Sequence, residues 1–147
     1  MTPSTRFALE PLAGDETAEA RLVADGRQTA VTLPGRCLEA QYALERGEFL
    51  LFLTHDVPYE EGLEICLLGS DLRLIDRITI VWPYATGHFR EPAIRSKHSL
   101  SFRFMGDHRW VVEVLSSPRL HLPFLSDPRG AWRPFRLWTR LILRAGG

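Results

Sequence analysis

The sequence predicts a mainly β fold: an antiparallel β-sandwich or barrel, built as a meander of hairpins, with a C-terminal amphipathic helix or strand covering one face. Three observations lead to this prediction. From Thr29 onward, apolar residues recur with a period of two. Short apolar runs follow one another about every 10–15 residues, which is typical of a sandwich or barrel. Two pairs of these runs also flank short turns that contain glycine.

The first two predicted strands differ in how much of their surface is buried. Residues 37–44 alternate between two sets, which indicates a strand with one buried face. The apolar set is Leu38, Ala40, Tyr42 and Leu44; the other set is Cys37, Glu39, Gln41 and Ala43. After the turn at 45–47, residues 49–54 are apolar on both faces, as in a central strand that is covered on both sides. Another sheet or a helix must therefore cover the second face.

The first predicted hairpin follows from the register of its apolar residues. Leu67 faces Leu72 and Ile65 faces Leu74, which leaves residues 69–70, Gly-Ser, as a two-residue loop. Glycine in the first position is what a type II′ turn requires. The apolar pattern and the turn chemistry therefore favour the same register.

The second predicted hairpin is argued in the same way. Phe104 faces Trp110 and Phe102 faces Val112, with residues 106–108 as a three-residue loop. A two-residue turn at 106–107 would shift the register by one residue. Such a shift sends the apolar set of a strand to the wrong face, so the longer loop is favoured.

The whole chain, residues 1–147, is predicted to form one domain, because this is the usual length of one. Residues 1–14 are rich in Pro, Thr and Gly and are expected to form a loose N-terminal arm. Asp15 can cap a short helix through Ala24, although Ala20 could instead open a strand.

The C-terminal residues 134–144 fit either a helix or a strand. A helix that begins near Pro134, or at the helix-start pattern Asp127-Pro128, gathers the arginines on one face. In a strand, Arg136, Arg140 and Arg144 alternate with leucines. We expect the apolar side to cover the sheet and the arginines to face solvent. The alternative is a basic surface for an anionic membrane or an acidic partner.

Charge and composition exclude several classes of protein. The 18 basic residues balance the 18 acidic residues, which argues against general nucleic-acid binding. No apolar run is long enough for a secretion signal or a membrane helix, so a soluble cytoplasmic protein is expected. Cys37 and Cys66 are too few for a disulfide scaffold, and the predicted strands place them too far apart for a bridge.

Residues 82–97 interrupt the strand pattern and give the first candidate binding site. Aromatic residues offer contact area and arginines bind anions, and long loops often carry function. The favoured alternative is a short extra strand within residues 88–94 that packs its aromatic residues on the core. The candidate binding residues are Trp82, Tyr84, His88, Phe89 and Arg90, together with Arg136, Arg140 and Arg144 of the tail.

One constellation suggests catalysis. A tight hairpin at 44–47 sets Cys37 opposite His55 or Asp56, where His55 could activate the thiol and Asp56 could orient the imidazole. Neighbouring strands also bring Cys and His together by chance. The glutamates at 60, 61 and 64 are expected to lie in a solvated loop. No histidine pair has metal-ligand spacing, so neither a metal nor another cofactor is expected.

Three functions therefore stay open. The leading hypothesis is a non-catalytic binding or interaction module, whose partner is another protein or a small anionic or apolar ligand. The second is a small-molecule-binding β-barrel, because barrels can enclose such ligands. The third is an enzyme with a cysteine nucleophile, formed by Cys37, His55 and Asp56.

Overall fold

The computed structural model describes residues 1–13, 19–55, 62–81, 87–121, 127–134 and 137–146. These residues form three antiparallel sheets, which confirms the mainly β prediction; they contain no α-helix and do not close into a barrel. The elements are β1 (Thr2–Pro3), β2 (Phe7–Pro11), β3 (Ala20–Ala24), β4 (Arg27–Leu33), β5 (Cys37–Ala43), the 3-10 turn η1 (Glu45–Gly47), β6 (Phe49–Thr54), β7 (Leu63–Leu68), β8 (Leu74–Ile80), β9 (Arg90–Ile94), β10 (Ser99–Arg103), β11 (Arg109–Leu120), β12 (Ala131–Trp132) and β13 (Trp138–Gly146).

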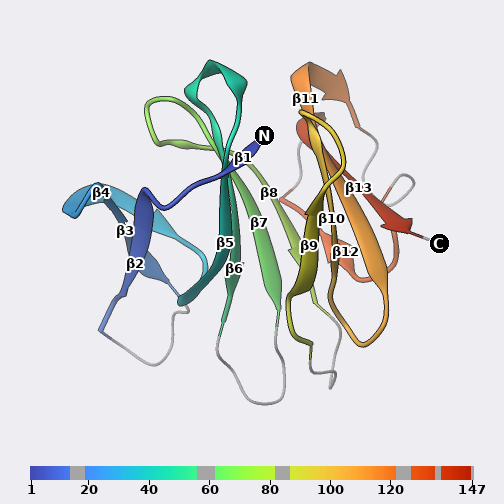
Figure 1. Cartoon of the computed structure of the whole chain (residues 1–147), viewed down its shortest axis with the longest axis horizontal. Coiled ribbons are helices and arrows are strands. Elements are labelled where there is room, and N and C mark those ends of the chain that lie inside the picture. Colours follow the sequence, from blue (N-terminus) through green and yellow to red (C-terminus); the bar gives the residue numbers. More distant parts are fainter. Residues whose placement is uncertain (14–18, 56–61, 82–86, 122–126, 135–136, 147) are drawn as a thin grey trace.

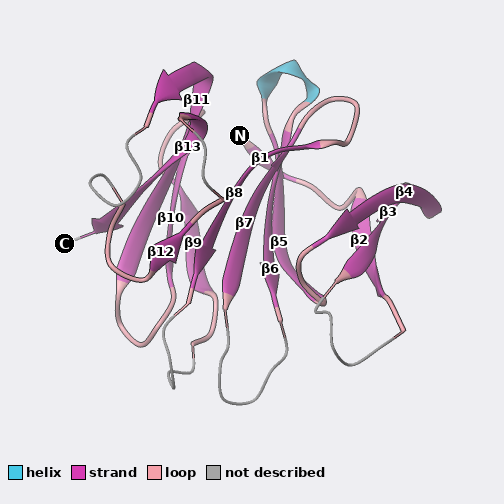
Figure 2. Ribbon diagram, turned by 180° about the vertical axis from the view of Figure 1, so that it is seen from behind, coloured by secondary structure: helices cyan, strands magenta, loops and turns pink. Residues whose placement is uncertain are grey.

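The three sheets stack as layers (Figures 1 and 2). The middle layer is a six-stranded sheet with the order β1-β5-β6-β7-β8-β12. A four-stranded sheet, β13-β11-β10-β9, packs on one of its faces, and a three-stranded sheet, β2-β3-β4, packs on the other. The two large sheets form a sandwich, and the small sheet is the cover that the second face required.

Strand β6 shows why the middle sheet needs a cover on both sides. It is buried along its whole length, as the sequence predicts. Leu50 and Phe52 belong to the core shared with the four-stranded sheet, whereas Leu51 and Leu53 belong to the core shared with the small sheet. Burying each such side chain contributes roughly 1.5–3 kcal/mol, so β6 anchors both layers.

The N-terminal predictions are wrong over the residues that the structure describes. The described part of the predicted loose arm over 1–14 is ordered into strands, because β1 pairs with β5 and β2 pairs with β3. The helix predicted over 15–24 is absent from its described part, where the alternative, a strand that opens at Ala20, is confirmed as β3. Burial alternates along this strand, with Ala20, Leu22 and Ala24 inside. Packing of this apolar face outweighs the helix propensity of an alanine-rich segment.

The register predicted for the β7–β8 hairpin is wrong by four residues. Ile65 lies opposite Ile78 rather than Leu74, and the loop runs from Gly69 to Arg73. The pairing also shifts between Leu67 and Leu68, so Leu74 lies opposite Leu68 and Leu72 packs on the core of the small sheet; both leave the face predicted for them. The observed register brings the fully buried Ile78 into the core and sets Thr79 opposite Glu64, to which it donates a hydrogen bond of 2.7 Å.

The β10–β11 hairpin differs from its predicted register by two residues. Phe102 pairs with Trp110, and the loop between the strands runs from Phe104 to His108, closed by a hydrogen bond of 3.2 Å from the amide of Phe104 to the carbonyl of His108. The side chain of Trp110 donates from Nε1 to the carbonyl oxygen of Phe104 at 3.0 Å, a buried bond that the observed register permits. The predicted faces are confirmed, since Phe102, Phe104 and Trp110 all lie in the main core.

The C-terminal segment is a strand rather than a helix. β13 pairs with β11, and its Leu141 and Leu143 are buried in the main core. The helix start predicted at Asp127-Pro128 is also wrong. Instead of capping a helix, the carboxylate of Asp127 binds the guanidinium of Arg133 through two hydrogen bonds of 2.9 and 3.0 Å and contacts His121 Nε2 at 2.9 Å.

Side chains join the two large sheets along the β8–β13 side. Asp76 of β8 is buried, and its Oδ2 accepts hydrogen bonds from the backbone amides of Arg140 and Leu141 at 2.8 and 3.0 Å. The hydroxyl of Thr139 donates to the same oxygen. Arg133, with 4% of its side chain exposed, donates to the carbonyl of Leu141 at 3.1 Å. This side of the sandwich is therefore closed.

Candidate functional site

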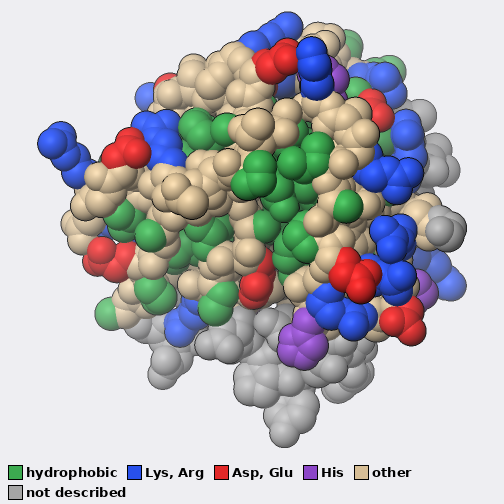
Figure 3. Space-filling view, in the orientation of Figure 1, with side chains coloured by type: hydrophobic (Ala, Val, Ile, Leu, Met, Phe, Trp, Pro, Cys, Tyr) green, Lys and Arg blue, Asp and Glu red, His purple; other side chains and the backbone are tan. Residues whose placement is uncertain are grey.

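A groove opens on the opposite side of the sandwich, where the edges of β5 and β9 face each other. Its volume is about 600 Å³, within the range of ligand sites. Hydrophobic side chains gather on this face between β5 and β9 (Figure 3). The lining residues are Pro3, Ser4, Phe7, Ala8, Leu9, Leu38, Glu39, Ala40, Gln41, Tyr42 and Pro92. The groove is thus mostly apolar, with a small number of polar groups.

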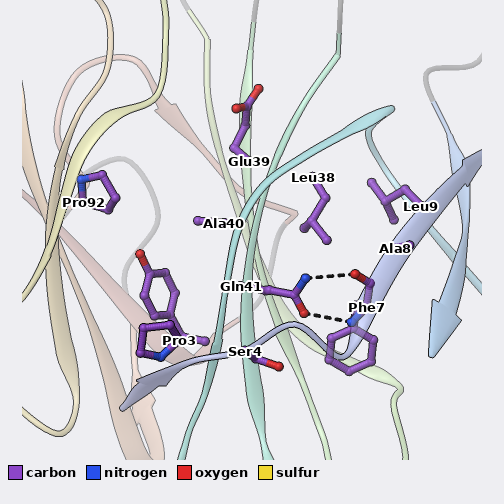
Figure 4. A pocket seen from close by; sticks show the side chains of 11 residues that line it. Pro3, Ser4, Phe7, Ala8, Leu9, Leu38, Glu39, Ala40, Gln41 and Pro92 are labelled. Carbon is purple, nitrogen blue, oxygen red and sulfur yellow. Dashed lines mark hydrogen bonds between the residues drawn. The ribbon is translucent and has the colours of Figure 1, made fainter. Parts of the chain in front are cut away.

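The path of the N-terminal segment creates the groove. β1 pairs with β5 only at Tyr42 and Ala43, and the last bond on this edge runs from the amide of Ser4 to the carbonyl of Gln41 at 3.0 Å. The chain then crosses to the small sheet. There, the side-chain amide of Gln41 binds both the N–H and the C=O of Phe7 at 2.9 Å (Figure 4). This pair of bonds fixes β2 beside β5 and leaves the rest of the β5 edge open.

The open edge of β5 comprises residues 38–40. Within the described part of the chain, no backbone hydrogen bond joins these residues to a strand on the side away from β6. The register between β5 and β6 also shifts between Leu38 and Ala40, which leaves Glu39 as an extra residue. Such bulges are common at sheet edges and next to functional sites.

Tyr42 is the polar group that stands out in the groove. Its side chain is 6% exposed and packs edge-on against Phe52, with ring centroids 6.1 Å apart. Burial raises the pKa of its phenol. Among the described residues none forms a hydrogen bond with the hydroxyl, although the ring lines the groove. The hydroxyl is not one of the buried unpaired polar atoms of the described structure, so it is accessible from the groove and can pair with a ligand there.

Glu39 supplies the charge of the groove. It is the one charged residue among those that line it in the described structure. The residue is exposed, and its Oε1 accepts a hydrogen bond of 2.7 Å from Thr54. The groove therefore combines apolar walls, one hydrogen-bonding phenol and one carboxylate. This combination suits an apolar ligand that carries both a hydrogen-bond acceptor and a cationic group.

The loop predicted to bind a ligand belongs partly to the sheet. β9 and its pairing with β10 confirm the extra strand predicted within 88–94. Phe89 lies between Phe52 and Phe102, with ring centroids 4.9 and 5.5 Å away, so it packs on the core. His88 is exposed, and Arg90 donates to the carbonyl of Gly106 at 2.7 Å. The candidates Trp82 and Tyr84 lie outside the described residues.

The tail arginines do not form one solvated stripe. Arg140 is 12% exposed and binds both carboxylate oxygens of Glu48, at 2.8 and 3.0 Å. Arg144 is 63% exposed and lies 3.7 Å from a carboxylate oxygen of Glu113. Arg136 falls outside the described residues. Arg140 and Arg144 therefore do not share one exposed surface, and Arg140 stabilises the fold through its ion pair with Glu48.

The structure gives His55 a different carboxylate partner from the predicted one. Cys37 is exposed and lies opposite Thr54, whereas His55 Nε2 contacts Glu64 at 2.9 Å. Asp56 lies outside the described residues. The solvated loop predicted for Glu64 is wrong, because this side chain is 1% exposed in β7. Cys66 is buried in the same strand, and burial raises the pKa of its thiol. The structure shows no disulfide at either cysteine.

Sequence reasoning placed Tyr42 correctly in β5 but treated it only as part of the core. Its hydroxyl is a signal, because a buried tyrosine usually finds a hydrogen-bond partner. Pro92 is a second signal, since proline in a strand marks an edge. What the sequence could not show is that the edges of β5 and β9 meet across a gap.

Comparisons with known proteins add no assignment to this geometry. No protein-family model, no curated protein and no solved structure matches the chain. Within the described ranges, no group of three or more potential ligand side chains could hold a metal ion, and no helix is long and apolar enough to cross a membrane. Any function must be argued from the residues themselves, above all from the groove and Tyr42.

Proposed function

We propose that this chain is a non-catalytic binding module whose ligand lies in the groove between β5 and β9. The observation that carries the proposal is the groove itself, a mostly apolar hollow of about 600 Å³ lined by Tyr42, whose hydroxyl is accessible there and binds no described residue. A ligand with a hydrogen-bond acceptor would pair this hydroxyl. Its apolar parts would cover Leu38 and Ala40.

The arrangement of the sheets supports binding rather than a purely structural role for the groove. The opposite side of the sandwich is joined by Asp76 and by the buried Arg133. The groove therefore exists without a ligand, and binding needs little reorganisation of the fold. Preformed, mostly apolar concavities with a few convergent polar groups are the usual form of a ligand site.

The proposal is tested by filling the groove. Ala8 is exposed on β2 and lines the groove, so Ala8→Trp fills it without disturbing the core. Ala30→Trp is the matched control, because Ala30 is exposed on β4 and does not line the groove. The probe is Nile red, a neutral apolar dye whose fluorescence rises in apolar surroundings.

We expect the protein and its Ala30→Trp variant to bind the dye, and Ala8→Trp to bind it about tenfold more weakly, since it loses most of the apolar surface. Thermal melting of all three proteins checks that they fold. Equal dye binding by the two variants would show that the groove is not the site. Absence of dye binding by the unmodified protein would also contradict the proposal.

A further inference from the structure

We infer that the ligand is an extended peptide of another protein, which adds a strand to the open edge of β5. This inference rests on the proposed function of the groove. Residues 38–40 of β5 present backbone groups that pair with no strand on that side in the described structure. An extended peptide can satisfy such groups by forming a strand, and its side chains then enter the adjacent pocket.

The chain's own N-terminus already uses this mode of pairing on the same edge. Thr2 and Pro3 form β1 against Ala43 and Tyr42, and Ser4 bonds to Gln41 before the segment turns away. A peptide at residues 38–40 would continue the line of β1. Three or four residues of it would span roughly 10–13 Å at the rise of a β-strand.

The facing edge of β9 is built against strand addition. Pro92 stands in the middle of β9 and has no backbone N–H to donate. Glu91, one residue before it, has a φ of +51°, which departs from strand geometry. Natural proteins protect sheet edges with prolines and irregular residues of this kind. The peptide therefore has one edge to pair with, that of β5.

The lining of the groove specifies the chemistry of the peptide. Alternate side chains of a strand point to opposite faces, and here both faces are apolar: Ala40 and Tyr42 lie towards the four-stranded sheet, whereas Leu38 and Leu9 lie towards the small sheet. The hydroxyl of Tyr42 can donate to a peptide carbonyl. The carboxylate of Glu39 favours Lys or Arg at the rim. We therefore infer an apolar segment next to a basic residue.

Selection from a random heptapeptide library on the full chain, with the Ala8→Trp variant as counter-selection, identifies the probe peptides. We expect enriched sequences to carry β-branched or aromatic residues next to Lys or Arg. Glu39→Gln should weaken their binding and reduce its dependence on salt, because it removes the carboxylate and keeps the size of the side chain. Enrichment without basic residues, or no loss with Glu39→Gln, would overturn the charge assignment.

Backbone methylation separates strand addition from other modes of binding. Each selected peptide is synthesised with N-methyl groups on its odd residues or on its even residues, because alternate N–H groups of a strand point to opposite edges. Methylation of one set should weaken binding about tenfold, while methylation of the other set should be tolerated. If both sets are tolerated, strand addition is wrong. If no peptide is enriched although Nile red binds, the groove holds a non-peptide ligand and only this inference fails.

Discussion

The two sides of the sandwich differ in how their polar side chains are hydrogen-bonded. On the β8–β13 side, the buried carboxylate of Asp76 accepts bonds from two backbone amides and from Thr139. The buried guanidinium of Arg133 is likewise bound by Asp127. On the β5–β9 side, the hydroxyl of Tyr42 is accessible from the groove and has no partner among the described residues. One side is completed by the chain itself, and the other is not.

This difference assigns the stability of the fold to the β8–β13 side and ligand binding to the β5–β9 side. A buried charge must be paired, because leaving it alone costs several kcal/mol. The β8–β13 side satisfies this requirement internally and so fixes the separation of the two large sheets. A hydroxyl that is accessible in the groove can bind water, so leaving it without a protein partner costs the fold little. The open side can therefore leave the hydroxyl of Tyr42 available to a ligand, because the closed side fixes the distance between the two large sheets.

The largest effect is expected from Asp76→Ala. This change leaves two buried amides and the hydroxyl of Thr139 without their acceptor, so the free energy of unfolding should fall by about 3–5 kcal/mol. Asp107→Ala is the control, because that carboxylate is 93% exposed; its loss should stay within about 0.5 kcal/mol. Urea unfolding measures both. Similar losses would show that the closed side does not depend on the Asp76 contacts.

A smaller, pH-dependent effect is expected at Glu64, which lies beside β8. Burial alone would raise the pKa of its carboxyl, but the hydrogen bonds from His55 and Thr79 and the charge of Arg77 outweigh burial and hold that pKa below its ordinary value. A carboxyl whose pKa is lower in the folded state stabilises the fold above its unfolded pKa. This stabilisation is lost as the pH falls through the folded pKa.

Glu64→Gln therefore tests the sign of this effect. At pH 7 the variant should lose about 1–3 kcal/mol of unfolding free energy, because a charged acceptor of several bonds is removed. The difference between the two proteins should shrink as the pH falls below about 4.3, the ordinary glutamate value. Glu45→Gln is the control, since this side chain is 62% exposed. A difference that stays constant with pH would contradict the lowered pKa.

The same comparison shows what the sequence could predict. The alternation over residues 37–43 and the doubly apolar run at 49–54 predicted β5 and β6, because burial on one or both faces is set by local pattern. The register between neighbouring strands was harder to predict. In the β10–β11 hairpin the predicted faces were right and the pairing was shifted by two residues, since alternation fixes the face but not the partner. In the β7–β8 hairpin the pairing was shifted by four residues, and an irregularity in the register moved Leu72 and Leu74 off their predicted face.

The candidate site was harder to predict than the strands. Glu64 and Arg133 look like solvated charges in the sequence, and only the meeting of distant segments buries them. The groove likewise depends on the departure of the N-terminal segment after Ser4. Local patterns contain no information on such long-range meetings. The sequence therefore directed attention to arginines of the tail, whereas the structure directs it to Tyr42.

The smallest effect on stability, and the sharpest contrast with Asp76→Ala, is expected from Tyr42→Phe. The ring and its edge-on contact with Phe52 are kept, and the hydroxyl that is removed has no partner in the described structure. The free energy of unfolding should change by less than about 0.5 kcal/mol, or rise slightly, because no hydrogen bond is lost. Binding of the selected peptides should weaken about tenfold, since the bound peptide loses a buried donor. Urea unfolding and fluorescence titration of the same samples measure both quantities. A large loss of stability would mean that the hydroxyl serves the fold, and unchanged peptide binding would mean that it does not serve the ligand.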